Sequence, residues 1–140
     1  MKPETIVLVQ KSFKAVAPIA DEAGALFYRR LFETHPELRP MFPEDIGPQA
    51  KKLMQMLALV VNGLHRLEEL MPAVESLARR HASYGVQPEH YPQVGAALIW
   101  TLETSLGDDF TPKVRQAWVI AYATLTDAMI AATIYSTTIH

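Results

Sequence analysis

Cysteine is absent from this 140-residue chain. Without thiols the chain can form no disulfide, no thiolate metal site, no iron–sulfur cluster and no covalent c-type haem attachment. The absence fits a reducing compartment without proving one. Any metal must therefore be bound by histidine, by carboxylates or through a cofactor.

The chain also lacks an excess of charge of one sign. Its 13 basic and 15 acidic residues leave a formal net charge of −2. The basic residues include scattered pairs at 29–30, 51–52 and 79–80, and such pairs form no extended cationic face for nucleic acid. We therefore expect no nucleic-acid partner.

Long hydrophobic runs are scarce. Near the N-terminus only the run IVLV stands between polar residues, which is too short for the core of a signal peptide and predicts a cytoplasmic protein. The apolar stretch Ala117–Tyr135 contains Asp127 near its centre, and a carboxylate there costs about 2.5–3.5 kcal/mol in a bilayer. We interpret this stretch as a buried final helix and expect no membrane span.

Common enzyme motifs are missing as well. With only six glycines, the chain has no G-x-G-x-x-G, no P-loop and no G-x-S-x-G, which excludes dinucleotide binding and a hydrolase elbow by those routes. It has no H-E-x-x-H and no pair of E-x-x-H motifs, which excludes the zinc-protease and di-iron patterns.

Helical periodicity is present along the whole chain. Apolar residues recur at steps of three and four, while the alternation typical of strands is absent. The pattern predicts helices over about 6–16, 21–33, 34–42, 49–64, 67–84, 91–106 and 112–134. Pro18 bends or ends the first helix. We therefore predict one all-α domain, residues 1–140, with six or seven helices and short connections.

Three local signals set the expected helix boundaries. Thr34 reads as a helix cap with Glu37 as its reciprocal partner three residues on. Thr111 followed by Pro112 is a second start signal. Gly85 is a natural stop for the helix before it.

His81 ends the inner stripe of its helix, after Val74 and Leu77. An imidazole in a last helical turn often only satisfies free carbonyls and suits the helix dipole. A haem, however, needs one axial imidazole and an apolar slot between helices, and the Met-, Leu- and Val-rich helix over 49–64 fits such a slot. Spacing alone leaves both interpretations open. The other histidines lie at helix boundaries or at the terminus, where solvent exposure is expected: His35, His65, His90 and His140.

Four ordered motifs carry a family resemblance over about residues 5–132. They are LFYRRLFETHPELRPMF at 26–42, QAKKLMQML at 49–57, RRHASYGVQPEHYPQVG at 79–95 and AWVIAY at 117–122. In these motifs the chain resembles the bacterial single-domain haemoglobins of the Vitreoscilla and Hell's Gate types and the globin domain of flavohaemoglobins. The resemblance implies a globin fold around a non-covalent haem b, with the iron protoporphyrin IX between the helices of Gln49 and His81.

The resemblance also implies roles for individual residues. His81 matches the iron ligand, Tyr28 and Gln49 match the polar pair that serves catalysis on the opposite side of the haem, and Phe42 matches an aromatic that packs on the porphyrin. The remaining positions expected to contact the cofactor are Leu53, Met56, Leu77, Arg80, Tyr91, Val94 and Leu98. The ordinary alternatives are core packing for Tyr28, Leu53 and Phe42, and solvation for Gln49 and Arg80.

The expected polar pair has a clear chemical use. Dioxygen bound to ferrous iron gains superoxide character, so a phenol donor from Tyr28, aided by Gln49, would hold it by charge-assisted hydrogen bonds. Each such bond contributes about 1.5–3 kcal/mol, or one to two decades of affinity. The resemblance therefore implies tight oxygen binding and slow release.

On the histidine's side of the haem, Tyr91 resembles a tyrosine that in flavohaemoglobins works with a carboxylate to tune the iron ligand. Alignment through AWVIAY puts that carboxylate at Thr133. Because threonine carries no charge, this departure puts the family's tyrosine–glutamate network in doubt.

Three functions follow as alternatives. The first is oxygen binding that supports the oxidation of nitric oxide to nitrate, with electrons from a separate reductase. The second is storage, delivery or sensing of oxygen or another haem ligand without catalysis. The third is a haem-free helical interaction module.

The last helix carries a feature of its own. If Val114, Trp118, Leu125 and Met129 face the core, then Ile120, Ile130 and Ile134 lie largely on the opposite side. Such an outward apolar stripe suggests a homodimer contact through this helix. The alternative is a helix buried on both sides.

Overall fold

In the computed structural model the backbone is described for residues 1–83 and 85–139, and side chains for 1–83 and 85–132. These residues form six α-helices and no strand. The helices are α1 (Pro3–Val16), α2 (Ala20–Thr34), α3 (Gly47–Asn62), α4 (Leu67–Ser83), α5 (His90–Leu106) and α6 (Pro112–Ile139), with short 3-10 segments η1 (Ala17–Ile19), η2 (Pro36–Met41), η3 (Leu64–Arg66) and η4 (Gly107–Asp109). The predicted all-α class with six or seven helices is confirmed, and the short helix over 34–42 is the 3-10 segment η2.

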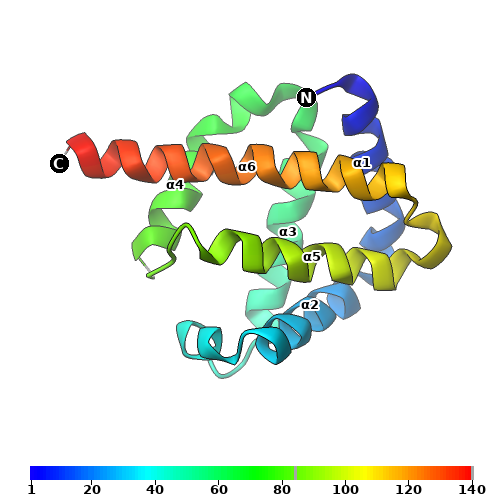
Figure 1. Ribbon diagram of the computed structural model, residues 1–140, viewed down its shortest axis with the longest axis horizontal. Helices are drawn as coiled ribbons and strands as arrows, with labels where there is room; N and C mark the ends of the chain where they lie inside the picture. The colour runs from blue at the N-terminus through cyan, green and yellow to red at the C-terminus, as the bar shows by residue number, and fades with distance from the viewer. Residues whose placement is uncertain (84, 140) are drawn as a thin grey trace.

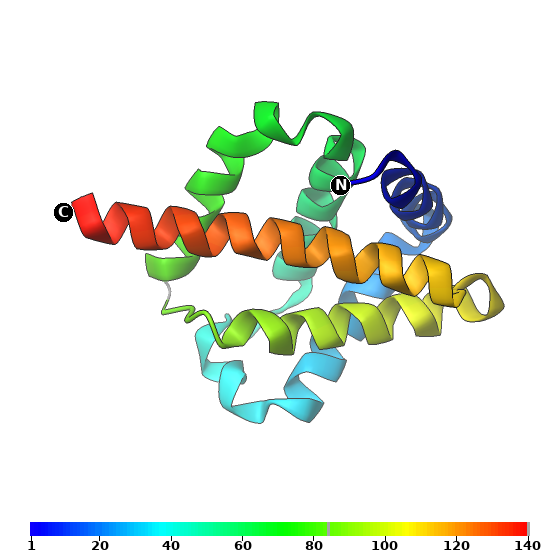
Figure 2. The same ribbon diagram turned by 45° about the horizontal axis from the view of Figure 1, so that its top comes forward.

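The long helix α6 organises the fold (Figure 1). It runs antiparallel beside α5, and the two are joined by the turn at η4 (Figures 1 and 2). Helix α1 packs on the N-terminal half of α6 and α4 on its C-terminal half, while α2 packs between α5 and α3. Helices far apart in the sequence are thereby stacked in crossed layers.

The buried residues fall into two clusters. The larger one includes Val9 and Leu31, both 0% exposed, and joins α1, α2, α3, α5 and the first half of α6. The smaller one consists of Val74 and Ala78 on α4 with Met129 on α6. Within the described residues α4 packs mainly on α6 and η3, with few contacts to α3 or α5. Helix α4 is thus the element least embedded in the main core.

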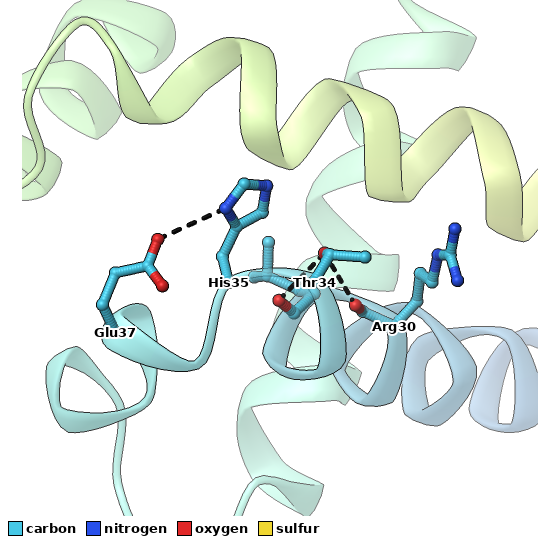
Figure 3. Close-up of polar contacts among 5 residues, drawn as sticks. Arg30, Thr34, His35 and Glu37 are labelled. Atoms are coloured by element: carbon cyan, nitrogen blue, oxygen red, sulfur yellow. Dashed lines mark hydrogen bonds and ion pairs between the residues drawn. The ribbon is translucent and has the colours of Figure 1, made fainter.

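The junction of α2 and η2 differs from the prediction (Figure 3). Thr34 is the last residue of α2, and its hydroxyl donates to the carbonyls of Arg30 at 2.9 Å and Leu31 at 3.3 Å. Glu37 instead approaches the His35 ring, with Oε1 3.3 Å from Nδ1. The predicted reciprocal capping of Thr34 and Glu37 is therefore wrong. Helix α2 continues through Thr34, and the Thr34 hydroxyl donates to backbone carbonyls of the preceding turn of α2 instead of capping a following helix.

Three other predicted boundary signals are confirmed. Helix α1 ends before Pro18, and the Thr111 hydroxyl accepts a hydrogen bond from the Val114 amide at 3.2 Å. Gly85 has φ +88° after the end of α4, a left-handed conformation that glycine adopts without strain. Helix α6 runs to Ile139, beyond the expected end near 134. Tyr84, the expected end of α4, lies outside the described residues.

The outer face of α6 is partly apolar. Val114, Trp118 and Met129 are buried and Leu125 is half-buried, as predicted, whereas Val119 and Ile120 are 45% and 37% exposed. Ile130 is half-buried, and the Ile134 side chain is outside the described part. Pairing of two copies through this face stays a prediction.

In residues 1–83 and 85–139, none of the helices combines the length and hydropathy needed to cross a membrane.

Candidate functional site

One part of the candidate site lies where α2 crosses α3. A Cβ added to Gly24 would lie 3.1 Å from the carbonyl oxygen of Ala50 and 3.2 Å from its Cβ. The missing side chain therefore lets the two backbones approach closely. Tyr28 follows Gly24 by one helical turn and Gln49 directly precedes Ala50. Consequently the crossing brings Tyr28 and Gln49 together.

Tyr28 is buried among aromatic rings. It is 4% exposed, and its ring centroid lies 4.9 Å from that of Phe27 and 5.5 Å from that of Phe42, both in edge contact. Burial raises the pKa of Tyr28 from 10.0 to about 12, while a side-chain hydrogen bond with Gln49 lowers this pKa in part. The phenol is thus protonated at neutral pH, and it is a hydrogen-bond donor next to a second polar group.

His81 lies in the last turn of α4 and is half-buried. Its Nδ1 is 2.8 Å from the carbonyl oxygen of Leu77. Burial lowers the pKa of His81; the Leu77 bond opposes this shift, and the nearby Arg80 charge adds to it. A neutral imidazole that donates from Nδ1 keeps the Nε2 lone pair available, which is the arrangement of a histidine metal ligand.

Five of the apolar residues that the sequence places against the cofactor lie on three helices. Leu53 and Met56 on α3, Leu77 on α4 and Val94 on α5 are all half-buried, and Leu98 on α5 is 6% exposed. The half-buried side chains keep apolar surface accessible that a flat apolar ligand could cover.

This donor set fits a haem better than a bare ion. Among the described residues no group of three or more histidine, aspartate or glutamate side chains is placed to hold a metal. One imidazole and extensive apolar surface suffice for a haem, because the porphyrin supplies the remaining ligands. The residues present therefore fit the cofactor that the sequence predicts.

The predicted residues do not all come together in one group. Phe42, Leu53, Met56, Val94 and Leu98 belong to or pack against the larger cluster with Tyr28. Leu77 and Tyr91 pack against the smaller cluster on α4 and α6. Arg80 is exposed, and its pairing with a haem propionate stays a prediction.

Sequence reasoning missed Tyr122. Its hydroxyl donates to the carbonyl oxygen of Tyr91 at 2.6 Å. A Cβ added to Gly95 would lie 2.6 Å from the Tyr122 ring, so the glycine lets α6 approach α5 at this point. The sequence feature that could have indicated it is the position of Tyr122 at the end of the AWVIAY motif, one helical turn after Trp118. Burial raises the pKa of Tyr122, and the Tyr91 phenol raises this pKa further.

The predicted tuning network of Tyr91 is only partly described. Burial raises the pKa of Tyr91, and its backbone carbonyl is bound by Tyr122. The side chain of Thr133, which stands at the family's carboxylate position, lies outside the described residues. The effect of this substitution stays a prediction.

Comparisons with known proteins give a consistent result. A family model described as globin matches residues 25–129. The flavohemoprotein of Rhodopirellula baltica is 35% identical over 133 residues, which cover 93% of this chain and 33% of that protein. The flavohemoprotein of Bacillus subtilis is 32% identical, with coverage of 91% and 33%. This chain thus spans about a third of the length of these relatives.

Two solved structures match nearly the full length of this chain, and nearly their own full length is matched as well. A bacterial globin from Campylobacter jejuni matches with a TM-score of 0.86 and 26% identity, covering 96% of this chain and 99% of that one. An engineered carbene transferase, made from a candidate nitric oxide dioxygenase of Rhodothermus marinus, matches with a TM-score of 0.86 and 30% identity. That match covers 100% of this chain and 99% of the other.

Proposed function

This chain belongs to the globin family, as the sequence motifs predict, and from that premise we propose that it is a haem protein that binds dioxygen reversibly. The globin and flavohemoprotein relatives imply a haem cofactor, and we assign it as haem b held without covalent bonds. The observation that carries the proposal is the imidazole of His81, bound through Nδ1 to Leu77, together with the pairing of the buried Tyr28 with the half-buried Gln49 on other helices.

Different residues would hold different parts of the haem. His81 would bind the iron through Nε2, and the Leu77 carbonyl fixes the ring orientation through Nδ1. The half-buried apolar side chains of α3, α4 and α5 would cover the macrocycle and exclude water. Arg80, which is exposed at the end of α4, would pair with a propionate at the solvent edge.

Tyr28 and Gln49 act on the ligand. The buried phenol of Tyr28 donates a hydrogen bond to the bound gas, and the Gln49 amide supports the phenol or donates directly. Each hydrogen bond from such a donor to a partly negative ligand contributes about 1.5–3 kcal/mol, and the burial of Tyr28 keeps its donor away from bulk water. Oxygen release is therefore slow.

The reaction that we propose is nitric oxide dioxygenation, NO + O2 + e− → NO3−. When bound, the haem supplies an iron that activates dioxygen and is left one electron poorer after each turnover. The chain's residues hold the oxygen ligand in place and keep water out. The electron would come from a separate reductase, as the resemblance to flavohaemoglobins implies. The name of the Rhodothermus marinus protein, a candidate nitric oxide dioxygenase, supports the proposed reaction.

Rapid mixing tests the proposal. The haem-loaded, reduced and oxygen-saturated protein is mixed with nitric oxide, and the absorption change and the nitrate formed are measured. We expect complete reaction within milliseconds and about one nitrate per haem. A slow reaction without stoichiometric nitrate would leave a protein that stores, delivers or senses oxygen. A chain that remains colourless when expressed with ample haem would contradict both haem functions and favour a helical interaction module.

A further inference from the structure

Arg39 spans the segment between η2 and α3. Its Nη1 donates to the carbonyl oxygens of Pro43 at 2.9 Å and Phe42 at 3.4 Å, and its Nη2 donates to that of Glu44 at 2.7 Å. These three carbonyls follow one another in a stretch outside the helices. One guanidinium therefore bonds three successive carbonyls where no helical ladder is present.

The same guanidinium also touches the aromatic cluster of the site. Its carbon lies 5.0 Å from the centroid of the Phe32 ring. The Phe32 ring lies 5.4 Å from Phe42 and 5.9 Å from Tyr28, and Tyr28 lies 5.5 Å from Phe42. Arg39 thus contacts the three-ring cluster of Tyr28, Phe32 and Phe42 through Phe32 and holds the backbone of Phe42.

The position of this segment in the chain gives the contact its consequence. The segment starts at Phe42, which we place against the haem, and leads into α3, where Gln49 stands in the first turn. A change in its path would move Phe42 and, through the ring contacts, the phenol of Tyr28. Hydrogen bonds to a small ligand lose strength quickly when the donor is displaced.

We propose that Arg39 is a positioning residue of the ligand pocket, which holds residues 42–44 so that Phe42 keeps its place against the haem and Tyr28 keeps its orientation toward the bound gas. This inference rests on the proposed haem function. Lysine cannot replace Arg39, because a single ammonium lacks the planar fork that reaches neighbouring carbonyls at once while it stacks on a ring.

The first test uses the haem-free protein and is independent of the proposed function. Hydrogen exchange of the amides over residues 42–49 is compared in the parent protein, Arg39→Ala and Arg39→Lys. We expect exchange in this segment to be about tenfold faster in both variants, because two short hydrogen bonds are lost or weakened. Unchanged exchange would overturn the proposal.

The second test uses the haem-loaded protein. We expect oxygen release about fivefold faster in Arg39→Ala, and a broadened or split carbon monoxide stretching band, since the pocket would then sample several orientations. Arg30→Lys is the matched control, because Arg30 lies over the Trp100 ring at 4.8 Å. The control should leave both readouts unchanged.

The two tests separate a failure of the Arg39 proposal from a failure of the proposed haem function. Faster exchange with unchanged oxygen release and an unchanged carbon monoxide band would make Arg39 a loop anchor without influence on the pocket, which overturns the proposal. If the parent protein takes up no haem, the proposed function fails while the exchange experiment still reports on the Arg39 contacts. Should Arg39→Ala fail to fold, Arg39→Lys carries both measurements, because it keeps the charge and most of the stem.

Discussion

On the α2–α3 side of the site, Tyr28 is 4% exposed, lies within 6 Å of three aromatic ring centroids, and belongs to the larger core cluster. On the α4 side, His81 is half-buried, and its helix is attached to α6 through the small cluster that contains Val74 and Met129. The wall that we propose faces the ligand is thus part of the main core, whereas the helix that carries the proposed iron ligand is attached at its margin.

The difference matches what each wall has to do. Hydrogen-bond donors for a small gas must be in place before the gas arrives, and packing achieves this at no further entropic cost. A histidine that coordinates iron is oriented by the coordination bond and by its Nδ1 partner. We therefore infer that the protein itself organises the Tyr28 wall, while the haem contributes to the order of α4.

The largest expected effect comes from the α4 wall. His81→Ala removes the axial ligand, so stable haem binding should be lost and the Soret band of the purified protein should disappear. His65, which is exposed in η3, provides the matched control, and His65→Ala should retain full haem content. A His81→Ala protein that keeps its haem through gel filtration would contradict the assignment.

The second prediction compares the two clusters in the haem-free protein. Leu31→Ala in the larger cluster should lower the global free energy of unfolding by about 2–5 kcal/mol, because Leu31 is fully buried. Val74→Ala should mainly speed hydrogen exchange in α4 and lower the global value less. Denaturant titration and hydrogen exchange measure both effects. Equal global losses in the two variants would show that the clusters unfold as one unit.

The third prediction tests the Tyr28 wall alone. Tyr28→Phe keeps the ring contacts and removes the donor, so oxygen release should become about 10- to 100-fold faster in stopped-flow measurements, while haem content stays unchanged. Phe27→Leu is a suitable control, because it changes a neighbouring ring and leaves the phenol in place. Oxygen release unaltered by Tyr28→Phe would remove Tyr28 from the ligand site.

The pKa of Tyr28 adds a pH signature to the same experiment. Because burial raises this pKa from 10.0 to about 12, the donor proton is present at every pH below that value, and oxygen release should not vary with pH through ionisation of Tyr28 between about pH 6 and pH 9. In the haem-free protein the neutral phenol stabilises the fold fully below pH 10, and this contribution is lost as the pH rises through about 12.

Local sequence signals predicted most of the fold. Pro18, the glycine after α4 and the Thr111 cap marked helix boundaries that the structure confirms. The signal at Thr34 failed, because a threonine three residues before a glutamate is equally compatible with the last residue of a helix. The backbone carbonyls available to its hydroxyl decided the outcome, and these depend on where α2 ends.

For the candidate site as well, some residues were predicted from the sequence and others were recognised only in the folded structure. Tyr28, Gln49, Phe42 and His81 were predicted as site residues because they stand at matching positions in motifs that resemble the family's. Arg39 and Tyr122 were missed, because each acts through backbone carbonyls whose position is defined only after the chain has folded. No pattern in the residues around Arg39 distinguishes a guanidinium that bonds a loop from one that is solvated.

By itself the sequence determined the helical class and the main helix boundaries, since periodicity and turn chemistry are local properties, while the family resemblance of its motifs pointed to His81, Tyr28 and Gln49 on three helices. Only the tertiary structure decided how deeply each group is buried and what it contacts. Two glycines, Gly24 and Gly95, allow close helix approaches that place Tyr28 beside Gln49 and Tyr122 on the carbonyl of Tyr91. Burial and pairing are properties of packed surfaces, and these exist only when distant segments meet.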